Sequence, residues 1–314
     1  MRLLRVIKPG FSTSLQDLGR RGFAGSGVSE AGAADAYSLR IGNLLVGNPE
    51  GAAGLEMTLV GGTFEVLSGA VIAVTGSDFA PALDGRAIPL WESLLVKAGD
   101  VLSFGATQSG ARCYLCVSGG IDVPEIMKSR STHLLTKIGG LDGRALREND
   151  FLHTFQRNHK DRELVGRKTP GEAIPLYSSS CILRVILGPD DDYFKKESIE
   201  TFLSSYYVIT ESSDRVGLRL DGALLEHSRG ADIPSEGVTT GAIQVPANGL
   251  PIILFVERPT TGGYPTIASV ISADLHRVGQ ARPRDTIRFQ SVSVEEAVEL
   301  LKAQEGLIKA QKPS

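Results

Sequence analysis

The stretch ERPTTGGYPTIASVISADL, from Glu257 to Leu275, contains the residue types best suited to holding a polar ligand. Thr260 and Thr261 supply hydroxyls, Tyr264 supplies a phenol, and the Gly262–Gly263 pair lets backbone N–H groups approach a ligand closely. Such donors suit an anion or an amide carbonyl. A plain turn between two strands would also use glycine and proline, so the residue types leave both interpretations open.

Four further clusters of polar residues interrupt the apolar background. They are LQDLGRRG at 15–22 with Gln16, Asp17 and Arg20, TGSDF at 75–79 with Ser77 and Asp78, SSDRVGLRLDG at 212–222 with Asp214, Arg215 and Arg219, and PSEGVTTGAIQVP at 234–246 with Ser235, Glu236, Thr239, Thr240 and Gln244. Their amides, carboxylates and guanidinium groups can bind polar substrates. Each cluster also has a structural explanation, because Asp–Arg pairs in turns are often exposed ion pairs and a Ser or Asp after a strand often caps a turn.

Several common catalytic and metal-binding patterns are missing from the sequence. It has no Gly-x-Ser-x-Gly elbow and no Walker loop, and its five histidines lack a metal-ligand spacing. Cys113 and Cys116 lie in RCYLCV, which predicts a strand with the two thiols on opposite faces. The segment EIMKS lacks the second Met of the Met-Lys turn that carries biotin, so Lys128 is predicted to be an ordinary surface lysine. We expect no metal site and no covalent biotin.

Composition narrows the class of protein and its partners. The 36 glycines and 15 prolines among 314 residues favour many short strands joined by turns. A formal net charge of −3 and a pI near 6.0 provide no basic field, so no nucleic-acid partner is expected. The apolar stretch of the amino terminus MRLLRVIKPG is too short for a signal-peptide core. No apolar segment approaches the length needed to span a membrane. Together with three cysteines, which fit a reducing compartment, this predicts a cytoplasmic protein without membrane contact.

Short strands must position most of the polar clusters. Alternating apolar residues predict strands near 63–79, 181–189 and 285–294, and the β-branched TIASVI predicts another after Pro265. The sequence therefore indicates a mainly β protein.

Helices and a domain boundary complete the predicted organisation. Helical spacing predicts one helix within 33–46 and a second after a capping box formed by Ser293 and Glu296. Ser272 is predicted to cap a short helix that ends near Gly279. The polar segment around 157–180 indicates a boundary between two lobes. We place the lobes at residues 1–165 and 166–314, the second carrying the C-terminal helix.

The motifs, taken in order, resemble the allophanate hydrolase subunit 2 family, also called KipA-like or carboxyltransferase subdomain proteins. They are KPGFSTSLQDLGRRGFAGSGVSEAGAAD, LVGNPEGAAGLEMTLVGG, VTGSDF, SGGIDVP, SRSTHLL, SDRVGLRLDG, SEGVTTGAIQVPANGLPIIL and PTTGGYPTIASVISADL. The resemblance covers about residues 5–290. Where the family usually has Asp-Arg-Gln-Thr-Thr-Gly-Gly-Tyr, this chain has Glu257 and Pro259 in place of the Asp and the Gln, which removes one amide beside the loop.

The resemblance implies a mainly β fold with a few helices, built as two cyclophilin-like β-barrel lobes. The family includes the C subunit of prokaryotic 5-oxoprolinase, which implies a place in an ATP-dependent complex that opens the lactam of 5-oxoproline to glutamate. The implied partners are the KipI-like B subunit, which is of the allophanate hydrolase subunit 1 family, and the A subunit of 5-oxoprolinase. The implied substrate is a small amide or lactam. The complex would use ATP, at a site not assigned to this chain.

The resemblance also directs the site prediction. We expect the threonine-glycine loop to form a ligand cradle at the rim of a lobe, facing the first polar cluster. Arg20 or Arg258 would bind a carboxylate or phosphate, and Glu236 would act as general base because burial can shift the pKa of a Glu toward neutrality. The predicted catalytic residues are Glu236, Thr261 and Tyr264. The predicted substrate-binding residues are Gln16, Asp17, Arg20, Ser77, Asp78, Gln244, Arg258, Thr260, Gly262 and Gly263.

Two other functions fit the same motifs. One is a carboxyltransferase-type component that acts on urea or another amide together with separate biotin-carrying chains. The other is a non-catalytic regulator that binds a KipI-like kinase inhibitor. Family resemblance determines the fold more firmly than the function, so both remain alternatives.

Overall fold

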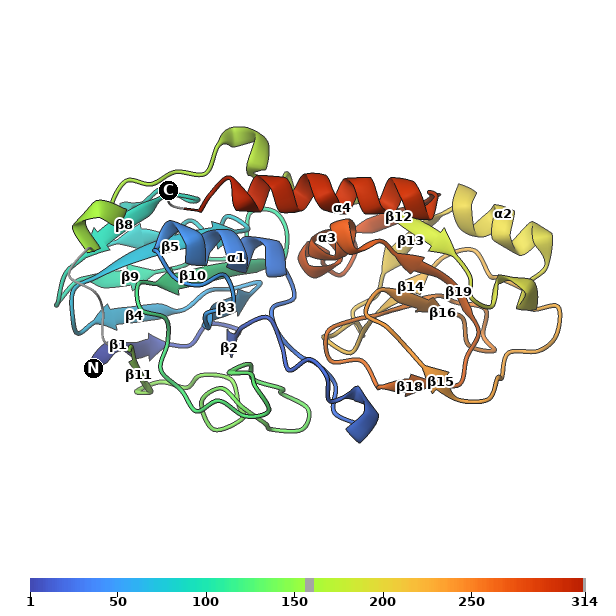
Figure 1. The fold of residues 1–314 in the computed structure, drawn as a ribbon, viewed down its shortest axis with the longest axis horizontal. Coiled ribbons are helices and arrows are strands. Elements are labelled where there is room, and N and C mark those ends of the chain that lie inside the picture. Colours follow the sequence, from blue (N-terminus) through green and yellow to red (C-terminus); the bar gives the residue numbers. More distant parts are fainter. Residues whose placement is uncertain (156–160, 313–314) are drawn as a thin grey trace. The chain divides into compact units, whose positions relative to one another are not determined.

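The computed structural model describes residues 1–155 and 161–312, and the chain separates into two compact units. The first unit comprises Met1–Arg21, Ala31–Tyr177 and Gly306–Ser314, and the second comprises Gly22–Glu30 and Ser178–Glu305 (Figure 1). Each unit includes a short segment that is distant in the sequence from the rest of that unit. The boundary between residues 165 and 166 stays a prediction.

The first unit is built on two sheets. One sheet has the strand order β11-β1-β4-β9-β6-β7, with β1 (Arg2–Lys8), β4 (Thr63–Val66), β6 (Ala82–Leu83), β7 (Arg86–Ala87), β9 (Val101–Ser103) and β11 (Phe151–His153). The other has the order β2-β3-β10-β5-β8, with β2 (Ser12–Gln16), β3 (Gly54–Thr58), β5 (Ala70–Gly76), β8 (Ser93–Val96) and β10 (Arg112–Val117). Alternate residues of both sheets, such as Val6, Phe64, Leu55 and Leu115, are fully buried in one hydrophobic core between them.

Helix α1 (Ala36–Leu45) packs against β5 and β10 of the second sheet and confirms the helix predicted within 33–46. Asp35 caps it, because its Oδ1 accepts a hydrogen bond of 2.9 Å from the backbone N–H of Ser38. Cys113 lies in the core between the sheets, whereas Cys116 lies in the cluster under α1. The two thiols therefore point to opposite faces of β10, as predicted.

The second unit contains a closed barrel with the strand order β12-β19-β16-β17-β14-β13-β20. Its strands are β12 (Ser180–Leu187), β13 (Tyr206–Ile209), β14 (Gly217–Asp221), β16 (Ala242–Gln244), β17 (Ile252–Leu254), β19 (Thr266–Val270) and β20 (Thr286–Ser291). Parallel pairing of β12 with β20 closes it, and Leu183, Ile253 and Phe289 are among the side chains buried in it. Helix α2 (Lys196–Ser204) stacks Phe202 on Phe289 with ring centroids 4.3 Å apart. A small ribbon of β15 (Glu236–Gly237) and β18 (Thr261–Gly262) carries much of the predicted site.

Two helices predicted near the end of the chain are present. The 3₁₀ turn η5 (Ser272–Asp274) leads into α3 (Leu275–Gln280), and α4 spans Val294–Lys309. The predicted cap by Ser272 is wrong, because Ser272 is the first residue of η5, whose N-cap is Ile271, and the N-cap of α3 is Asp274. Ser293 Oγ accepts a hydrogen bond of 3.1 Å from the N–H of Glu296, as its capping position predicts. Shorter 3₁₀ turns are η1 (Ala24–Ser26), η2 (Asp161–Leu164), η3 (Gly171–Ala173) and η4 (Asp191–Tyr193). The mainly β fold with a few helices is therefore confirmed.

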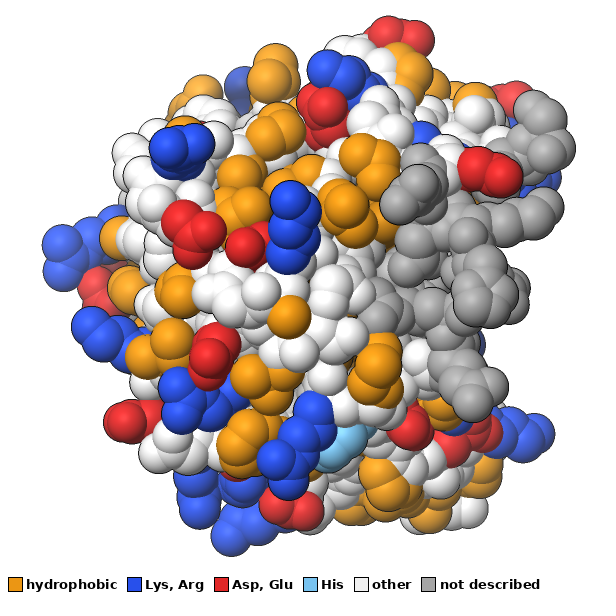
Figure 2. Space-filling view, turned by 90° about the vertical axis from the view of Figure 1, so that its left-hand side faces the viewer, with side chains coloured by type: hydrophobic (Ala, Val, Ile, Leu, Met, Phe, Trp, Pro, Cys, Tyr) orange, Lys and Arg blue, Asp and Glu red, His pale blue; other side chains and the backbone are white. Residues whose placement is uncertain are grey.

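The surface of the first unit mixes charges of both signs. The face in Figure 2 shows Lys and Arg interspersed with Asp and Glu, with hydrophobic side chains between them. Within residues 1–155 and 161–312, no helix combines the length and the apolar character needed to cross a membrane.

Candidate functional site

The threonine-glycine loop lies in the second unit, where it pairs with the segment that contains Glu236. In the β15–β18 ribbon, Glu236 is opposite Gly262 and Gly237 is opposite Thr261. Two flanking hydrogen bonds extend the pairing, from the N–H of Val238 to the carbonyl of Thr260 at 3.1 Å and from the N–H of Ile233 to the carbonyl of Gly263 at 3.0 Å. Two clusters that are separate in the sequence are thus brought together.

Gln244 ties the loop to the barrel. Its side chain is 4% exposed, and its Nε2 donates a hydrogen bond of 2.9 Å to the carbonyl of Tyr264. A Cβ on residue 262 would lie 2.5 Å from this Nε2, so a side chain at that position would displace the amide. Glycine at position 262 leaves room for this nearly buried amide. Tyr264 itself is 41% exposed, so its phenol is open to a ligand.

Glu236 lies beside a second carboxylate that the sequence analysis did not identify. The pKa of Glu236 is raised, first by partial burial and then by the negative charge of Asp190 and a hydrogen bond with it. Asp190 is fixed by Thr266, whose N–H donates to Asp190 Oδ2 at 2.9 Å and whose carbonyl accepts from the N–H of Asp190 at 3.1 Å. Asp190 could have been identified from the sequence as an acidic residue directly after the predicted strand at 181–189.

Arg258 is buried beneath the loop rather than displayed on it. Its side chain donates from Nε to the carbonyl of Val238 at 3.1 Å, and its Nη2 lies 3.8 Å from Oε1 of Glu30. Burial lowers its pKa, which the carboxylate of Glu30 partly opposes. Its Nη1 has no hydrogen-bond partner among the described residues. One guanidinium nitrogen is therefore left without an acceptor at a buried position.

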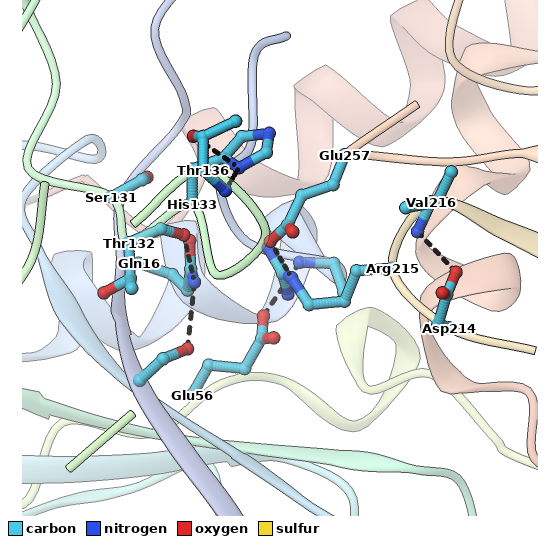
Figure 3. Close-up of polar contacts among 12 residues, drawn as sticks. Gln16, Glu56, Ser131, Thr132, His133, Thr136, Asp214, Arg215, Val216 and Glu257 are labelled. Carbon is cyan, nitrogen blue, oxygen red and sulfur yellow. Dashed lines mark hydrogen bonds and ion pairs between the residues drawn. The ribbon is translucent and has the colours of Figure 1, made fainter. Parts of the chain in front are cut away.

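The neighbouring Glu257 forms a nearly buried ion pair. Arg215 Nε lies 2.5 Å from Glu257 Oε1 (Figure 3). The two side chains are only 12% and 3% exposed. Asp214 accepts hydrogen bonds at Oδ1 from the N–H groups of Val216 and Gly217, which fixes the turn before β14. These contacts give Arg215 and Asp214 structural roles at the base of the loop.

A pocket of about 570 Å³ opens beside the loop. Strands β14, β16 and β17 form its floor, and the loop contributes Pro259 and Tyr264. Its lining residues are Asp214, Val216, Gly217, Arg219, Gln244, Pro246, Asn248, Ile252, Leu254, Pro259 and Tyr264. Of the predicted site residues, Gln244 and Tyr264 line this pocket. Glu236, Thr260, Thr261 and Arg258 are not among its lining residues.

The first polar cluster lies in the first unit, where it organises the segment 129–133. Gln16 is fully buried and its Nε2 donates to Ser14 Oγ at 2.9 Å and to the carbonyl of Thr132 at 3.0 Å (Figure 3). Arg20 is also fully buried and donates from Nη2 to the carbonyl of Ser131. These contacts hold the loop after β2 against the segment 129–133.

Asp17 is the centre of this arrangement. Its Oδ1 accepts hydrogen bonds from the N–H of Gly19 at 2.8 Å and from Ser129 Oγ at 2.7 Å, and also from Ser131 Oγ. Its Oδ2 accepts from the N–H of Arg130 at 2.5 Å. A carboxylate with this many internal donors has a structural function. That these residues face the threonine-glycine loop stays a prediction.

Ser77 and Asp78 have internal partners as well. Ser77 is fully buried with its Oγ 2.7 Å from Thr107 Oγ1, and Asp78 Oδ1 accepts a hydrogen bond of 2.6 Å from the N–H of Ala80. The second contact is the turn cap that a residue after a strand often provides. Substrate binding by this pair also stays a prediction.

A buried polar network under α1 was not anticipated from the sequence. Tyr114 Oη donates to Glu56 Oε2 at 2.6 Å and accepts from the N–H of Asp35 at 2.8 Å. Glu56 Oε2 also accepts from the N–H of Ala34 at 2.8 Å, and Arg112 lies 3.8 Å from Glu56 Oε1. Burial and the Glu56 carboxylate raise the pKa of Tyr114. The network fixes the chain where α1 begins.

The described part of the chain contains no group of three His, Cys, Asp or Glu side chains that could hold a metal ion. The burial of Cys113 raises the pKa of its thiol, and the same cause raises the pKa of Cys116. Neither thiol has the lowered pKa of a reactive cysteine.

Comparison with known proteins places the chain in a family. Residues 26–291 match the model of the carboxyltransferase domain, subdomains A and B. The chain is 39% identical to the C subunit of 5-oxoprolinase from Escherichia coli over 296 residues, which is 94% of this chain and 93% of that protein. It is 37% identical to urea amidolyase of Saccharomyces cerevisiae over 98% of this chain and 18% of that protein. The crystal structure of the K. lactis urea amidolyase superimposes with a TM-score of 0.93 and 33% identity over 99% of this chain and 20% of that one. The chain belongs to the carboxyltransferase domain family, subdomains A and B.

Proposed function

We propose that this chain is the C subunit of an ATP-dependent 5-oxoprolinase and acts only together with a KipI-like B subunit, of the allophanate hydrolase subunit 1 family, plus the A subunit of the enzyme. Near-full-length similarity to two bacterial proteins that carry the name of this C subunit supports the assignment, since 94% and 93% of this chain align with them. The reaction is the hydrolysis of the lactam of 5-oxoproline to glutamate. The chain is the subunit that holds the small amide.

The observation that carries the proposal is the convergence of Glu236, Gln244 and the threonine-glycine loop in the second unit. The loop offers hydroxyls of Thr260 and Thr261 and glycine N–H groups, which can stabilise an oxygen that gains negative charge. Glu236, with its raised pKa, is the proposed general base. Tyr264 is the proposed second donor.

ATP supplies the activation of an otherwise poor electrophile in the complex. Arg219 is the one cationic side chain that lines the pocket beside the loop, so this pocket lacks the several positive groups of a triphosphate site. A triphosphate requires several positive or backbone N–H groups in one cradle. The ATP site of the complex is not assigned to this chain, and the proposed role of this chain is to bind, orient and exchange protons with the substrate.

A carboxyltransferase function remains the second candidate, because the chain also aligns with urea amidolyase over 98% of its length. That function would require biotin on another chain. The third candidate is a regulator that binds a KipI-like protein without turnover.

Reconstitution separates the three functions. Glutamate release from 5-oxoproline and ATP is measured with the three subunits together and with each omitted in turn. Release that requires this chain supports the proposal. Turnover of urea that depends on a biotin-carrying chain supports the second candidate, and a stable complex that releases no glutamate supports the third.

A further inference from the structure

The pocket beside the loop has an ordered arrangement of side chains across three adjacent strands. Arg219 on β14 is opposite Ile252 on β17, and Ile252 is opposite Gln244 on β16. Residues directly opposite one another point to the same face of a sheet. Because neighbouring strands are about 4.8 Å apart, Arg219 and Gln244 are separated by about 10 Å at the backbone with the apolar Ile252 between them. All three residues line the pocket.

The charge in the pocket favours an anionic group at one end. Arg219 is exposed, and none of the described side chains forms an ion pair or hydrogen bond with its guanidinium. The carboxylate that lines the same pocket belongs to Asp214, whose Oδ1 is occupied by the N–H groups of Val216 and Gly217. A guanidinium in this setting is suited to a carboxylate, which it can bind with two parallel hydrogen bonds.

The opposite end of the pocket has the polarity of an amide-binding site. Gln244 lines the pocket and donates from Nε2 to the carbonyl of Tyr264, while its Oε1 can accept a hydrogen bond. Asn248 uses its Oδ1 to accept from the N–H of Leu250 at 3.1 Å, which leaves its Nδ2 to donate. The phenol of Tyr264 is a further donor. One acceptor beside two donors complements the N–H and C=O of a secondary amide.

The floor between the two ends is apolar and open. Ile252 and Leu254 supply the apolar surface, and Gly217, opposite Leu254, has no side chain to fill the space. A Cβ on Gly217 would lie 3.1 Å from Cγ2 of Ile252. Pro259 adds an apolar wall, at the position where the family usually has a glutamine. The methylene groups of a small ring fit this surface.

From this row we infer that the pocket binds a small carboxylate that carries a secondary amide, with the carboxylate on Arg219, the ring over Ile252, and the amide at Gln244, where the pocket meets the threonine-glycine loop. The inference rests on the proposed function for its probe, because 5-oxoproline has a carboxylate, a ring N–H and a ring carbonyl. Arg219, Asn248 and Ile252 are then substrate-binding residues in addition to Gln244 and Tyr264.

The test uses the full chain, alone and in the assembled complex, with Arg219→Gln and the matched control Arg288→Gln. Arg288 is another exposed strand arginine of the same barrel and does not line this pocket. Calorimetric titration measures binding of 5-oxoproline to the chain, with pyrrolidin-2-one, which lacks the carboxylate, as the comparison ligand. Glutamate release measures KM and kcat in the complex.

Arg219→Gln is expected to weaken 5-oxoproline binding and raise KM by at least about tenfold, as the loss of one charge-assisted pair predicts. Pyrrolidin-2-one binding should not change, and Arg288→Gln should match the unmodified chain. If glutamate release requires this chain but Arg219→Gln leaves KM unchanged, that result overturns the pocket assignment and leaves the proposed function intact. Arg219-dependent binding without any glutamate release supports the pocket and overturns the function. If the chain does not bind 5-oxoproline and the complex releases no glutamate, both the pocket assignment and the proposed function are wrong.

Discussion

Gln244 Nε2 donates a hydrogen bond of 2.9 Å to the carbonyl of Tyr264, and this contact joins the barrel floor to the threonine-glycine loop. The amide occupies the space that a side chain on residue 262 would need. One amide therefore both holds the loop and fills the space beside Gly262.

Gly262→Ala is predicted to disrupt the site. Its Cβ would lie 2.5 Å from Gln244 Nε2, so the amide must move and its hydrogen bond to Tyr264 is lost. We expect a loss of stability of about 1–3 kcal/mol, typical of overpacking, together with reduced glutamate release. Thermal denaturation and the reconstituted assay measure the two effects.

The adjacent glycine provides the control. At Gly263 the nearest atom to an added Cβ is the carbonyl oxygen of Ile233 at 3.5 Å, an ordinary contact. Gly263→Ala should therefore leave the melting temperature close to that of the unmodified chain. Equal destabilisation by both variants would show that the contact with Gln244 is not the cause.

The carboxyl pair of Glu236 and Asp190 predicts a specific pH dependence. A general base acts when it is deprotonated, so activity should rise as pH increases through the raised pKa of Glu236. Asp190→Asn removes the neighbouring negative charge, lowers the pKa of Glu236 and should shift this acidic limb to lower pH. Glu236→Gln should abolish turnover. An acidic limb that stays in place in Asp190→Asn would rule out the coupling, and the pH profile of kcat/KM measures it.

The same pair affects stability with a defined sign. Because the folded-state pKa of Glu236 is raised, its stabilising contribution is complete below the ordinary pKa of a Glu and is lost as pH rises through the raised value. Asp190→Asn should reduce this loss. Denaturant unfolding of the two proteins at several pH values measures the difference, and parallel pH dependence in both would contradict it.

The ion pair of Arg215 and Glu257 predicts a large cost for removing one partner. Glu257→Ala removes the carboxylate that accepts a charge-assisted hydrogen bond from Arg215 Nε at a nearly buried position, and we expect a loss of about 1.5–3 kcal/mol of unfolding free energy. The exposed pair of Arg284 and Glu211 is a matched control, since its side chains are 86% and 68% exposed. Glu211→Ala should cost less than about 1 kcal/mol. Chemical denaturation distinguishes the two, and similar costs would show that burial does not set the strength of the pair.

Local features of the fold could be predicted from the sequence because they depend on short-range periodicity. The strand alternation in DTIRFQSVSV, the capping by Ser293 and the opposite faces of Cys113 and Cys116 all follow from spacing within a few residues. Gly22–Glu30 belongs to the second unit and Gly306–Ser314 to the first, and no local sequence pattern predicts this assignment.

The site was predictable only in part, because its contacts join distant segments. Residue types identified Glu236, Gln244 and the threonine-glycine loop, but the pairing of Glu236 with Gly262 depends on strand register across the fold. Asp190 was missed because its importance comes from its position beside Glu236. The sequence also did not reveal that four groups of the chain itself donate to the carboxylate of Asp17, because three of them lie in the distant segment 129–131. Substrate binding by Asp17 stays a prediction.

Glutamate release by the reconstituted complex with Thr261→Val tests the central claim most directly. Thr261 is exposed, its backbone is in the β15–β18 ribbon, and valine keeps its shape while removing the hydroxyl. If the loop holds the substrate for the reaction, release should fall by about 10²-fold or more, as for the loss of one donor to a developing oxyanion, while the melting temperature stays unchanged. Full release by this variant would contradict the account.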